Sequence, residues 1–196
     1  MARDSKARMV RSAAALIGTR GLSATSFSEV LEHSGAPRGS IYHHFPDGKR
    51  QLAEGAIDWT SDQVLGHLRA CPSTTPAALL ACFIDLWRQS VLASRGSSGC
   101  AVAGVAIDIG AFEDDLIGIV RKTFRTWVAE LAARLAELNV PADRARSIAF
   151  TAVASMEGAL ILCRAEGNSR PLEAIATELM RLLPEKKSGS RSMRQP

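Results

Sequence analysis

The chain has 196 residues, of which 46% are hydrophobic and 5% aromatic, and its formal net charge is +4. This length suits one full core, or a small domain joined to a larger one. No stretch alternates β-branched with polar residues, which argues against sheets and predicts an all-α protein. The first residues lack the apolar segment of a signal peptide, so we expect a cytoplasmic protein.

The charges are unevenly distributed along the chain. Residues 1–50 carry eight Lys/Arg and four Asp/Glu, whereas residues 51–184 carry twelve and fifteen, and residues 185–196 carry four and one. A basic first segment on a mildly acidic body suggests contact with a polyanion. A chance excess in so short a segment is the alternative.

The cysteines predict neither a disulfide framework nor a zinc site. Cys71, Cys82, Cys100 and Cys163 are far apart and form no CxxC pair. Such spacing on apolar stretches is typical of buried free thiols in a reducing compartment. We expect no metal and no cofactor. A thiol-sensing role stays open for Cys100, beside the flexible loop 94–99, although a small buried apolar residue is the favoured interpretation.

Two helices are predicted near the start of the chain. Residues 3–20 form an amphipathic helix, ended by Gly21, with an apolar stripe of Met9, Ala13, Leu16 and Ile17. In the next helix, Ser26 and Glu29 match a capping box, and Gly35 closes the helix. Both helices therefore have a face to bury.

A third, very short helix follows. Pro37 suits its first turn, and Pro46 ends it because the residue before a proline avoids helical geometry. Ile41 and Phe45 share the side that must pack on the first two helices, since so short a helix is unstable alone. The outward and flanking residues are Arg38, Gly39, Ser40, Tyr42, His43 and His44.

Two helices joined by a tight turn in a basic segment are typical of a helix-turn-helix DNA-binding module. Helix N-terminal amides and the hydroxyls of Thr25, Ser26 and Ser40 can bind phosphates. Arg38 and His43 are candidates for base edges, and Lys49, which opens the next helix, for a phosphate.

This segment has three alternative interpretations. Tyr42 could simply pack against its neighbours. A metal pair at His43 and His44 is disfavoured because adjacent helical residues diverge by about 100°. Residues 39–49 lack the glycine at position 43 that a phosphate-binding P-loop would need.

The stretch TSFSEVLEHSGAPRGSIYHHFPDGKRQLAEGAI resembles the N-terminal module of the TetR/AcrR family of bacterial transcriptional repressors over about residues 5–60. PRGSIYHHFPDGK, with the later GCAVAGVAID, is most similar to the subgroup around the lincomycin-resistance repressors. The resemblance implies a DNA-binding homodimer whose larger C-terminal domain binds a small inducer. By position it implies phosphate contacts from Thr25, Tyr42, His44 and Lys49, and groove contacts from Arg38, Gly39, Ser40 and His43.

The rest of the chain is predicted to be helical, giving about nine helices in all. Long helices are expected at 49–70, 76–93, 112–138, 141–165 and 171–184, with a short small-residue segment at 100–110 whose glycines allow close approach. This divides the chain into a helix-turn-helix domain (1–48), a ligand-binding and dimerisation domain (49–184, with 49–70 as connector) and a disordered basic tail (185–196).

Residues 147–163 carry one charge, Glu157, and are apolar nearly all round. A membrane span is disfavoured because the segment is short and a central carboxylate would cost about 2.5–3.5 kcal/mol. A helix apolar on every side is instead buried on every side, by its own domain and by a twin. The predicted homodimer interface comprises Val153, Leu160, Leu172, Ile175 and Leu179.

The ligand chamber is predicted among aromatic residues of the body. The candidate lining residues are Trp59, Phe83, Trp87, Phe112, Phe124, Trp127 and Met156, any of which could instead be plain core. Polar contacts that orient the ligand could come from Asp85, Gln89, Asp108 or Glu157.

Together these features predict a repressor that releases operator DNA when a small apolar or aromatic ligand tilts the connector helix. The alternatives are a helical protein-interaction module without DNA binding and a small-molecule enzyme. The enzyme is disfavoured because the chain has no HExxH motif and no evident nucleophile–base pair.

Overall fold

The structure is a computed structural model that describes residues 2–108 and 114–184. Within these ranges it contains nine helices and no strand, which confirms the predicted all-α fold. The helices are α1 (Ala2–Arg20), α2 (Phe27–Ser34), α3 (Ser40–His44), α4 (Gly48–Ala70), α5 (Pro76–Ala93), α6 (Ala101–Ile107), α7 (Asp114–Glu137), α8 (Ala142–Glu166) and α9 (Arg170–Arg181). The predicted chamber residue Phe112 and the predicted disordered tail lie outside the described residues.

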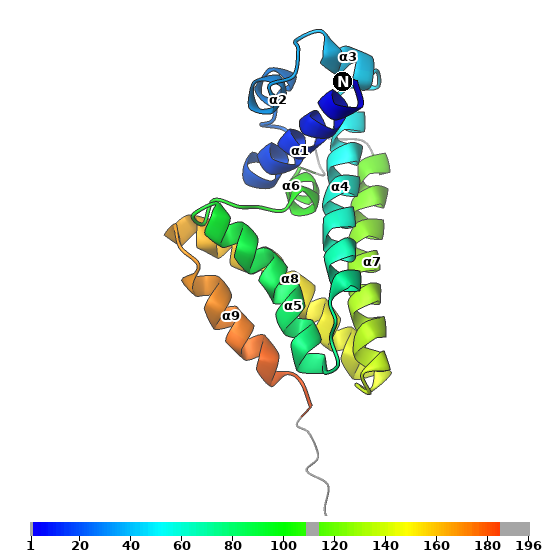
Figure 1. Cartoon of the computed structure of the whole chain (residues 1–196), viewed down its shortest axis with the longest axis vertical. Helices are drawn as coiled ribbons and strands as arrows, with labels where there is room; N and C mark the ends of the chain where they lie inside the picture. Colours follow the sequence, from blue (N-terminus) through cyan, green and yellow to red (C-terminus); the bar gives the residue numbers. More distant parts are fainter. Residues whose placement is uncertain (1, 109–113, 185–196) are drawn as a thin grey trace, which may run out of the picture.

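Helices α1 to α3 form one end of the molecule (Figure 1). The apolar stripe predicted on α1 is buried, from Met9 to Ile17. Ile41 and Phe45 are almost fully buried, at 0% and 1% exposure, as the helical spacing predicts. The short α3 is therefore held by its apolar side, and its polar side is turned away from the module's core.

The ends of α2 also follow from its sequence. The Glu29 backbone N–H donates to the Ser26 hydroxyl at 3.3 Å, and the Ser26 N–H donates to the Glu29 carboxylate at 2.9 Å. These bonds form the predicted capping box. Gly35 ends the helix with φ 61°, a left-handed conformation that suits glycine.

Helix α3 is shorter than predicted. It begins at Ser40 rather than at Pro37, and it has only five residues. The Pro37 carbonyl accepts hydrogen bonds from the Ser40 N–H at 2.9 Å and from the Ser40 hydroxyl at 2.6 Å. The bond from the Ser40 N–H to the carbonyl three residues earlier closes a turn, so Pro37 lies just outside α3.

The body is built from α4 to α9. Figure 1 shows α4 and α7 running along the length of the molecule, with α5, α8 and α9 packed beside them. By length and composition, Pro76–Ala93 and Ala142–Glu166 could cross a membrane. Both contribute many side chains to the body's core, which accounts for their apolar composition.

The module and the body meet where the end of α1 lies against α6, almost backbone to backbone. A Cβ on Gly104 would overlap the Ile17 carbonyl, and a Cβ on Gly99 would overlap the Gly18 carbonyl. The close approach predicted for the glycines of 100–110 is therefore present, and no side chain separates the two segments.

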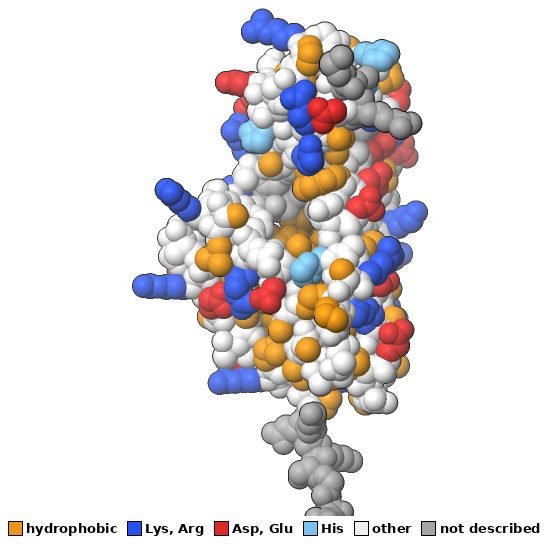
Figure 2. All heavy atoms as spheres, viewed as in Figure 1, with side chains coloured by type: hydrophobic (Ala, Val, Ile, Leu, Met, Phe, Trp, Pro, Cys, Tyr) orange, Lys and Arg blue, Asp and Glu red, His pale blue; other side chains and the backbone are white. Residues whose placement is uncertain are grey.

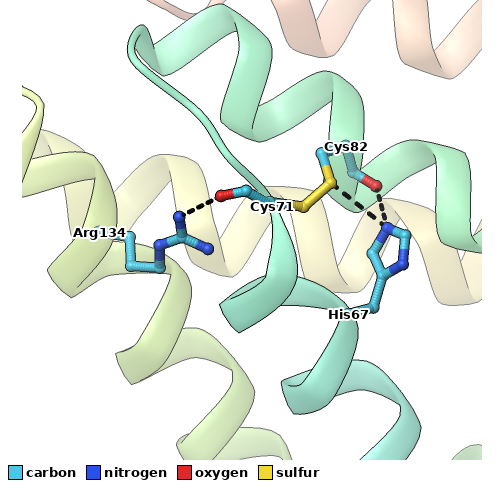
Figure 3. The surroundings of a disulfide bond; sticks show 4 residues. All are labelled: His67, Cys71, Cys82 and Arg134. Carbon is cyan, nitrogen blue, oxygen red and sulfur yellow. Dashed lines mark hydrogen bonds between the residues drawn. A yellow bond between two sulfur atoms is a disulfide. The ribbon is translucent and has the colours of Figure 1, made fainter.

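The prediction of four free thiols is wrong for two cysteines. Cys71 and Cys82 are joined by a disulfide bond (Figure 3). Cys100 and Cys163 are free and buried. The turn after α4 folds α5 back alongside it, which brings together cysteines 11 residues apart. The spacing of the cysteines in the sequence does not show that the chain reverses direction between them.

We expect Gly104→Ala to lower the free energy of unfolding by about 1–3 kcal/mol, because the new methyl group must push α6 away from α1. The matched control is Gly118→Ala on α7, where a Cβ meets nothing within 4 Å. In that control the free energy of unfolding should rise by about 1 kcal/mol, because alanine has a better helix propensity than glycine. Urea unfolding measures both, and equal effects would contradict the close contact.

Candidate nucleic-acid interface and ligand groove

The outer side of α3 and its preceding turn is exposed. Arg38, Gly39 and His43 are exposed, Tyr42 is 70% exposed, and a Cβ on Gly39 would meet nothing within 4 Å. In Figure 2, a histidine side chain lies at the end of the molecule formed by α3, and a Lys or Arg side chain projects beyond it. This end can approach a large anion without rearranging the backbone.

The rings on this surface are supported from within the module. The Tyr42 ring meets Phe27 edge to face, with centroids 5.7 Å apart. His43 and His44 lie 5.3 Å apart between centroids, and His44 is only partly exposed. Tyr42 therefore packs with one edge and still presents most of its surface.

A recess between the start of α2 and the start of α4 brings together three predicted phosphate-binding residues. It has a volume of about 330 Å³ and is lined by Ser23 to Phe27 and by Lys49. It lies at the N-terminus of α2, where the helix dipole favours an anion, while the Ser26 and Glu29 amides are bonded within the capping box. The predicted residues Thr25, Ser26 and Lys49 thus share one site, although they come from different elements.

Lys49 and Thr25 also have partners inside the chain. The Lys49 ammonium donates to the Ser23 carbonyl at 3.0 Å. Partial burial lowers the pKa of Lys49, while the charges of Asp108 and Glu29 raise it. Thr25 is buried, and its hydroxyl donates to the Gly21 carbonyl at 2.8 Å. Thr25 therefore supports the recess, and a phosphate contact by its hydroxyl stays a prediction.

Asp108 connects this end to the body. Its carboxylate, just after α6, accepts a hydrogen bond from the Ser23 N–H at 2.7 Å. From α8, Arg164 donates to the Thr19 carbonyl at the end of α1. The sequence predicts Asp108 as a residue that could orient a ligand, but the structure gives its carboxylate a partner in the module of α1 to α3.

The predicted chamber residues partly converge. Phe83, Trp87, Trp127 and Phe124 form a continuous chain of rings, with centroid distances of 6.4, 6.2 and 5.5 Å between successive pairs. Phe83, Trp127 and Met156 are fully buried, whereas Trp59 is partly buried at the edge of the core. Most of these residues serve as core packing in this structure.

Two buried polar atoms in this region have no hydrogen-bond partner: Trp87 Nε1 and Glu157 Oε1. The Trp127 indole N–H, by contrast, donates to Ser61 at 3.2 Å. An unpaired buried polar group costs about 1–3 kcal/mol, so a native protein needs a reason to keep one. A ligand that accepts from Trp87 or donates to Glu157 would remove that cost.

A large concave surface is formed by a groove between α7 and α8. It has a volume of about 1410 Å³ and a mostly apolar lining that includes Phe124, Val128 and Phe150. Glu157 lines this groove, and Arg121 and Arg125 belong to its wall. Phe124 lines the groove and is also the last member of the chain of rings that begins at Phe83, which we call the ring cluster. The groove and the ring cluster therefore adjoin.

Glu157 is electrostatically unusual. Burial raises its pKa to about 7, while a hydrogen bond with the Cys100 thiol acts in the opposite direction. Burial, together with the nearby Glu157 carboxylate, raises the pKa of Cys100 well above its ordinary value. Cys100 therefore stays a protonated, buried thiol, which agrees with its interpretation as a small apolar residue.

The predicted dimer-interface residues are mostly used within the subunit. Val153, Leu160, Leu172 and Leu179 are buried in this chain's own core, and only Ile175 is partly exposed. The stripe of α8 that faces outward comprises Phe150, Ala154, Gly158, Ile161 and Leu162, and its largest side chains are about half to two-thirds exposed. The sequence pattern missed this stripe because residues 147–163 are apolar on all sides, so spacing could not identify the outward side.

Two family models match the chain. Residues 10–56 match the N-terminal model of the bacterial regulatory proteins of the tetR family. Residues 76–178 match the C-terminal domain of LmrA/YxaF-like transcriptional regulators. The first match ends at residue 56 and the second begins at residue 76, so the second half of α4 lies between them.

Curated relatives cover nearly the whole chain. An HTH-type transcriptional regulator from Mycobacterium tuberculosis strain H37Rv is 37% identical over 181 residues, which are 90% of this chain and 92% of the relative. The HTH-type transcriptional regulator LmrA from Bacillus subtilis strain 168 is 25% identical, over 92% of this chain and 97% of the relative.

Solved structures show the same fold. A TetR transcriptional regulator from Legionella pneumophila superposes with a TM-score of 0.80 at 22% identity, over 90% of this chain and 96% of the other. The regulatory protein TetR from Rhodobacter sphaeroides gives a TM-score of 0.78 at 21% identity, over 90% and 97%. The exposed α3, the matched models and these relatives lead to one conclusion: the chain belongs to the TetR family of helix-turn-helix transcriptional regulators.

Proposed function

We propose that this regulator represses transcription by binding an operator as a homodimer, and that it releases the operator when a small apolar or aromatic ligand binds its body. The observation that carries this proposal is the exposed edge of α3, held from behind by the buried Ile41 and Phe45. We infer a cytoplasmic, non-enzymatic protein, in keeping with its family.

In this proposal the turn and α3 enter the major groove of DNA. Arg38 and His43 contact base edges, with Gly39 and Ser40 close to the bases, because Gly39 leaves room for approach. Tyr42, His44, Ser26 and Lys49 bind the phosphates on either side, and the recess at the start of α2 receives one of them. Two copies would read half-sites about 34 Å apart.

The outward stripe of α8 is the surface that we assign to dimerisation. Phe150 and Ile161 expose large apolar areas, and Ala154 and Gly158 between them allow a second helix to approach closely. Ile175 on α9 lies partly exposed and can extend the contact. The proposed interface is thus centred on α8, and the buried leucines predicted for it support the stripe from beneath.

The groove between α7 and α8 is the proposed ligand site. Its apolar lining suits an aromatic or aliphatic ligand, and the unpaired Glu157 oxygen can accept a hydrogen bond from a donor group on that ligand. Phe150 belongs to both the groove and the dimer stripe, so a second copy packed on the stripe would cover this rim.

The signal would reach DNA through two contacts of the body with the module. One is α4, which begins next to the recess and ends in the body. The other is α6, whose backbone touches α1 and whose C-terminal Asp108 holds the Ser23 N–H. A full shift of a 99:1 equilibrium requires the ligand to favour the released form by about 5.5 kcal/mol.

Two substitutions should separate base reading from phosphate binding. With an operator selected from random duplexes, Arg38→Ala should relax the preference at one base pair and cost about 1–3 kcal/mol. Lys49→Ala should weaken binding to all sequences and reduce the slope of log affinity against log salt by about 1. Gel-shift titrations measure both effects. Lys122→Ala on α7 is the control, and a wild-type protein without sequence preference would contradict the proposal.

The dimer surface can be tested at Gly158, where a Cβ meets nothing within 4 Å of the subunit. Gly158→Arg should leave the subunit folded but bury an unpaired charge in the dimer. The cost, about 3 kcal/mol or more, corresponds to a dissociation constant at least about a hundredfold higher. Analytical ultracentrifugation measures the change. Gly66→Arg, at an equally open glycine on α4, should stay dimeric, and an unaffected Gly158→Arg dimer would place the interface elsewhere.

Glu157 should make stability depend on pH. In the folded protein its pKa is about 7, above the ordinary value of 4.5. Its contribution to the free energy of unfolding is therefore fully present below pH 4.5 and is lost as the pH rises through 7. Between about pH 5 and pH 8 this amounts to roughly 2–3 kcal/mol. Glu157→Gln should lack this loss, so its advantage over wild type grows with pH in urea unfolding. The exposed Glu166→Gln is the control, and parallel profiles for wild type and Glu157→Gln would refute the assignment.

A further inference from the structure

A side-chain cluster at the end of α4 has no role in the proposed binding of DNA or ligand. Cys71 caps the C-terminus of α4, and Cys82 lies in the second turn of α5, bonded to it through sulfur. With His67, one turn before Cys71, their potential ligand atoms all lie within 4.8 Å of one another. Figure 3 shows His67 directed at Cys82 from one side and Arg134 directed at Cys71 from the other.

His67 gives Cys82 the surroundings of a reactive sulfur. Its Nε2 lies 2.8 Å from the Cys82 carbonyl oxygen, to which it donates, and 3.4 Å from the Cys82 sulfur. In the reduced protein the same N–H would stabilise a thiolate on Cys82. Cys82 is also partly exposed, so a small oxidant can reach it from solvent.

Cys71 has the complementary properties. It is only 4% exposed, and it follows the last turn of α4, where the helix dipole disfavours a negative charge. It is therefore the poorer nucleophile towards an external oxidant, but it lies within bonding distance of Cys82. One cysteine can meet the oxidant, and the other can complete the bond.

Arg134 distinguishes an oxidation site from a metal site. Its Nη2 donates to the Cys71 carbonyl at 2.8 Å, and its Nη1 is buried without a partner. A guanidinium cation fixed next to Cys71 opposes a bound dication by charge repulsion. The three-residue cluster therefore suits thiol oxidation better than zinc.

We propose that Cys71 and Cys82 are a redox site whose oxidant is a hydroperoxide. The Cys82 thiol loses its proton to solvent, and its sulfur attacks the peroxide; an S–O bond forms, the O–O bond breaks, and an alcohol or water leaves after taking up a proton. The Cys71 sulfur then attacks Cys82, an S–S bond forms, and the hydroxyl leaves as water with the Cys71 proton. Two thiols and one peroxide yield one disulfide, one alcohol or water and one further water.

This reaction changes whether α4, the connector helix, is covalently held at its body end. Oxidation ties the body end of α4 to α5, and reduction by a dithiol releases it. The inference does not depend on the proposed ligand or on the DNA-reading residues. Its chemistry can be measured on the whole chain without knowing either.

The test begins with the reduced full-length protein treated with hydrogen peroxide. Alkylation and peptide mapping should show two thiols lost and one Cys71–Cys82 bond gained, while Cys100 and Cys163 remain thiols. In Cys71→Ser, a sulfenic-acid probe should label residue 82, and Cys82→Ser should take up no label. The Cys100→Ser/Cys163→Ser double variant is the matched control and should react like wild type.

The role of His67 has its own measurement. In the Cys71→Ser background, His67→Leu should slow labelling by about tenfold, and His67→Gln, which keeps an N–H donor, should slow it less. Oxidation first at Cys71, Cys100 or Cys163, or failure of the Cys71–Cys82 bond to form, would overturn the proposal. So would stoichiometric zinc binding by the reduced protein that blocks oxidation, since the cluster would then be a metal site.

Discussion

The structure depends on the burial of two side chains behind a five-residue helix. Ile41 and Phe45 place the short α3 against α1 and α2, and without them a helix of this length would not persist in water. Everything exposed on its other side, from Arg38 to His44, is positioned by this apolar contact. The residues proposed to contact DNA are therefore held in place by packing against α1 and α2.

The body has a different problem, which is the burial of polar atoms among apolar side chains. Trp87 Nε1 and Glu157 Oε1 have no partner, although both belong to the interior near the ring cluster and the groove. A protein made only for stability would satisfy or replace them. A receptor benefits from leaving them unpaired, because a ligand that pairs with them gains affinity and a ligand that cannot is rejected.

Much of this architecture could be predicted from the sequence, because the signals are local. The capping box at Ser26, the glycine that ends α2 and the apolar stripe of α1 each depend on residues a few positions apart. The start of α3 was missed because the fixed φ of proline permits a turn as well as a helix, and residues 37–40 form a turn.

The other misses concern contacts between distant residues. The Cys71–Cys82 bond depends on how α5 folds back on α4, and the role of Asp108 depends on a partner 85 positions away. The outward side of α8 depends on which of its apolar faces the rest of the body covers. Periodicity describes each helix alone, whereas these features belong to pairs of helices.

The contact between α1 and α6 has a consequence for how a signal could travel. Where two helices meet through side chains, a small displacement is absorbed by changes of rotamer before any backbone moves. At Gly104 and Ile17 no side chain can absorb a displacement in this way, because main chain meets main chain. A shift of α6 towards α1 would therefore press directly on the main chain of α1.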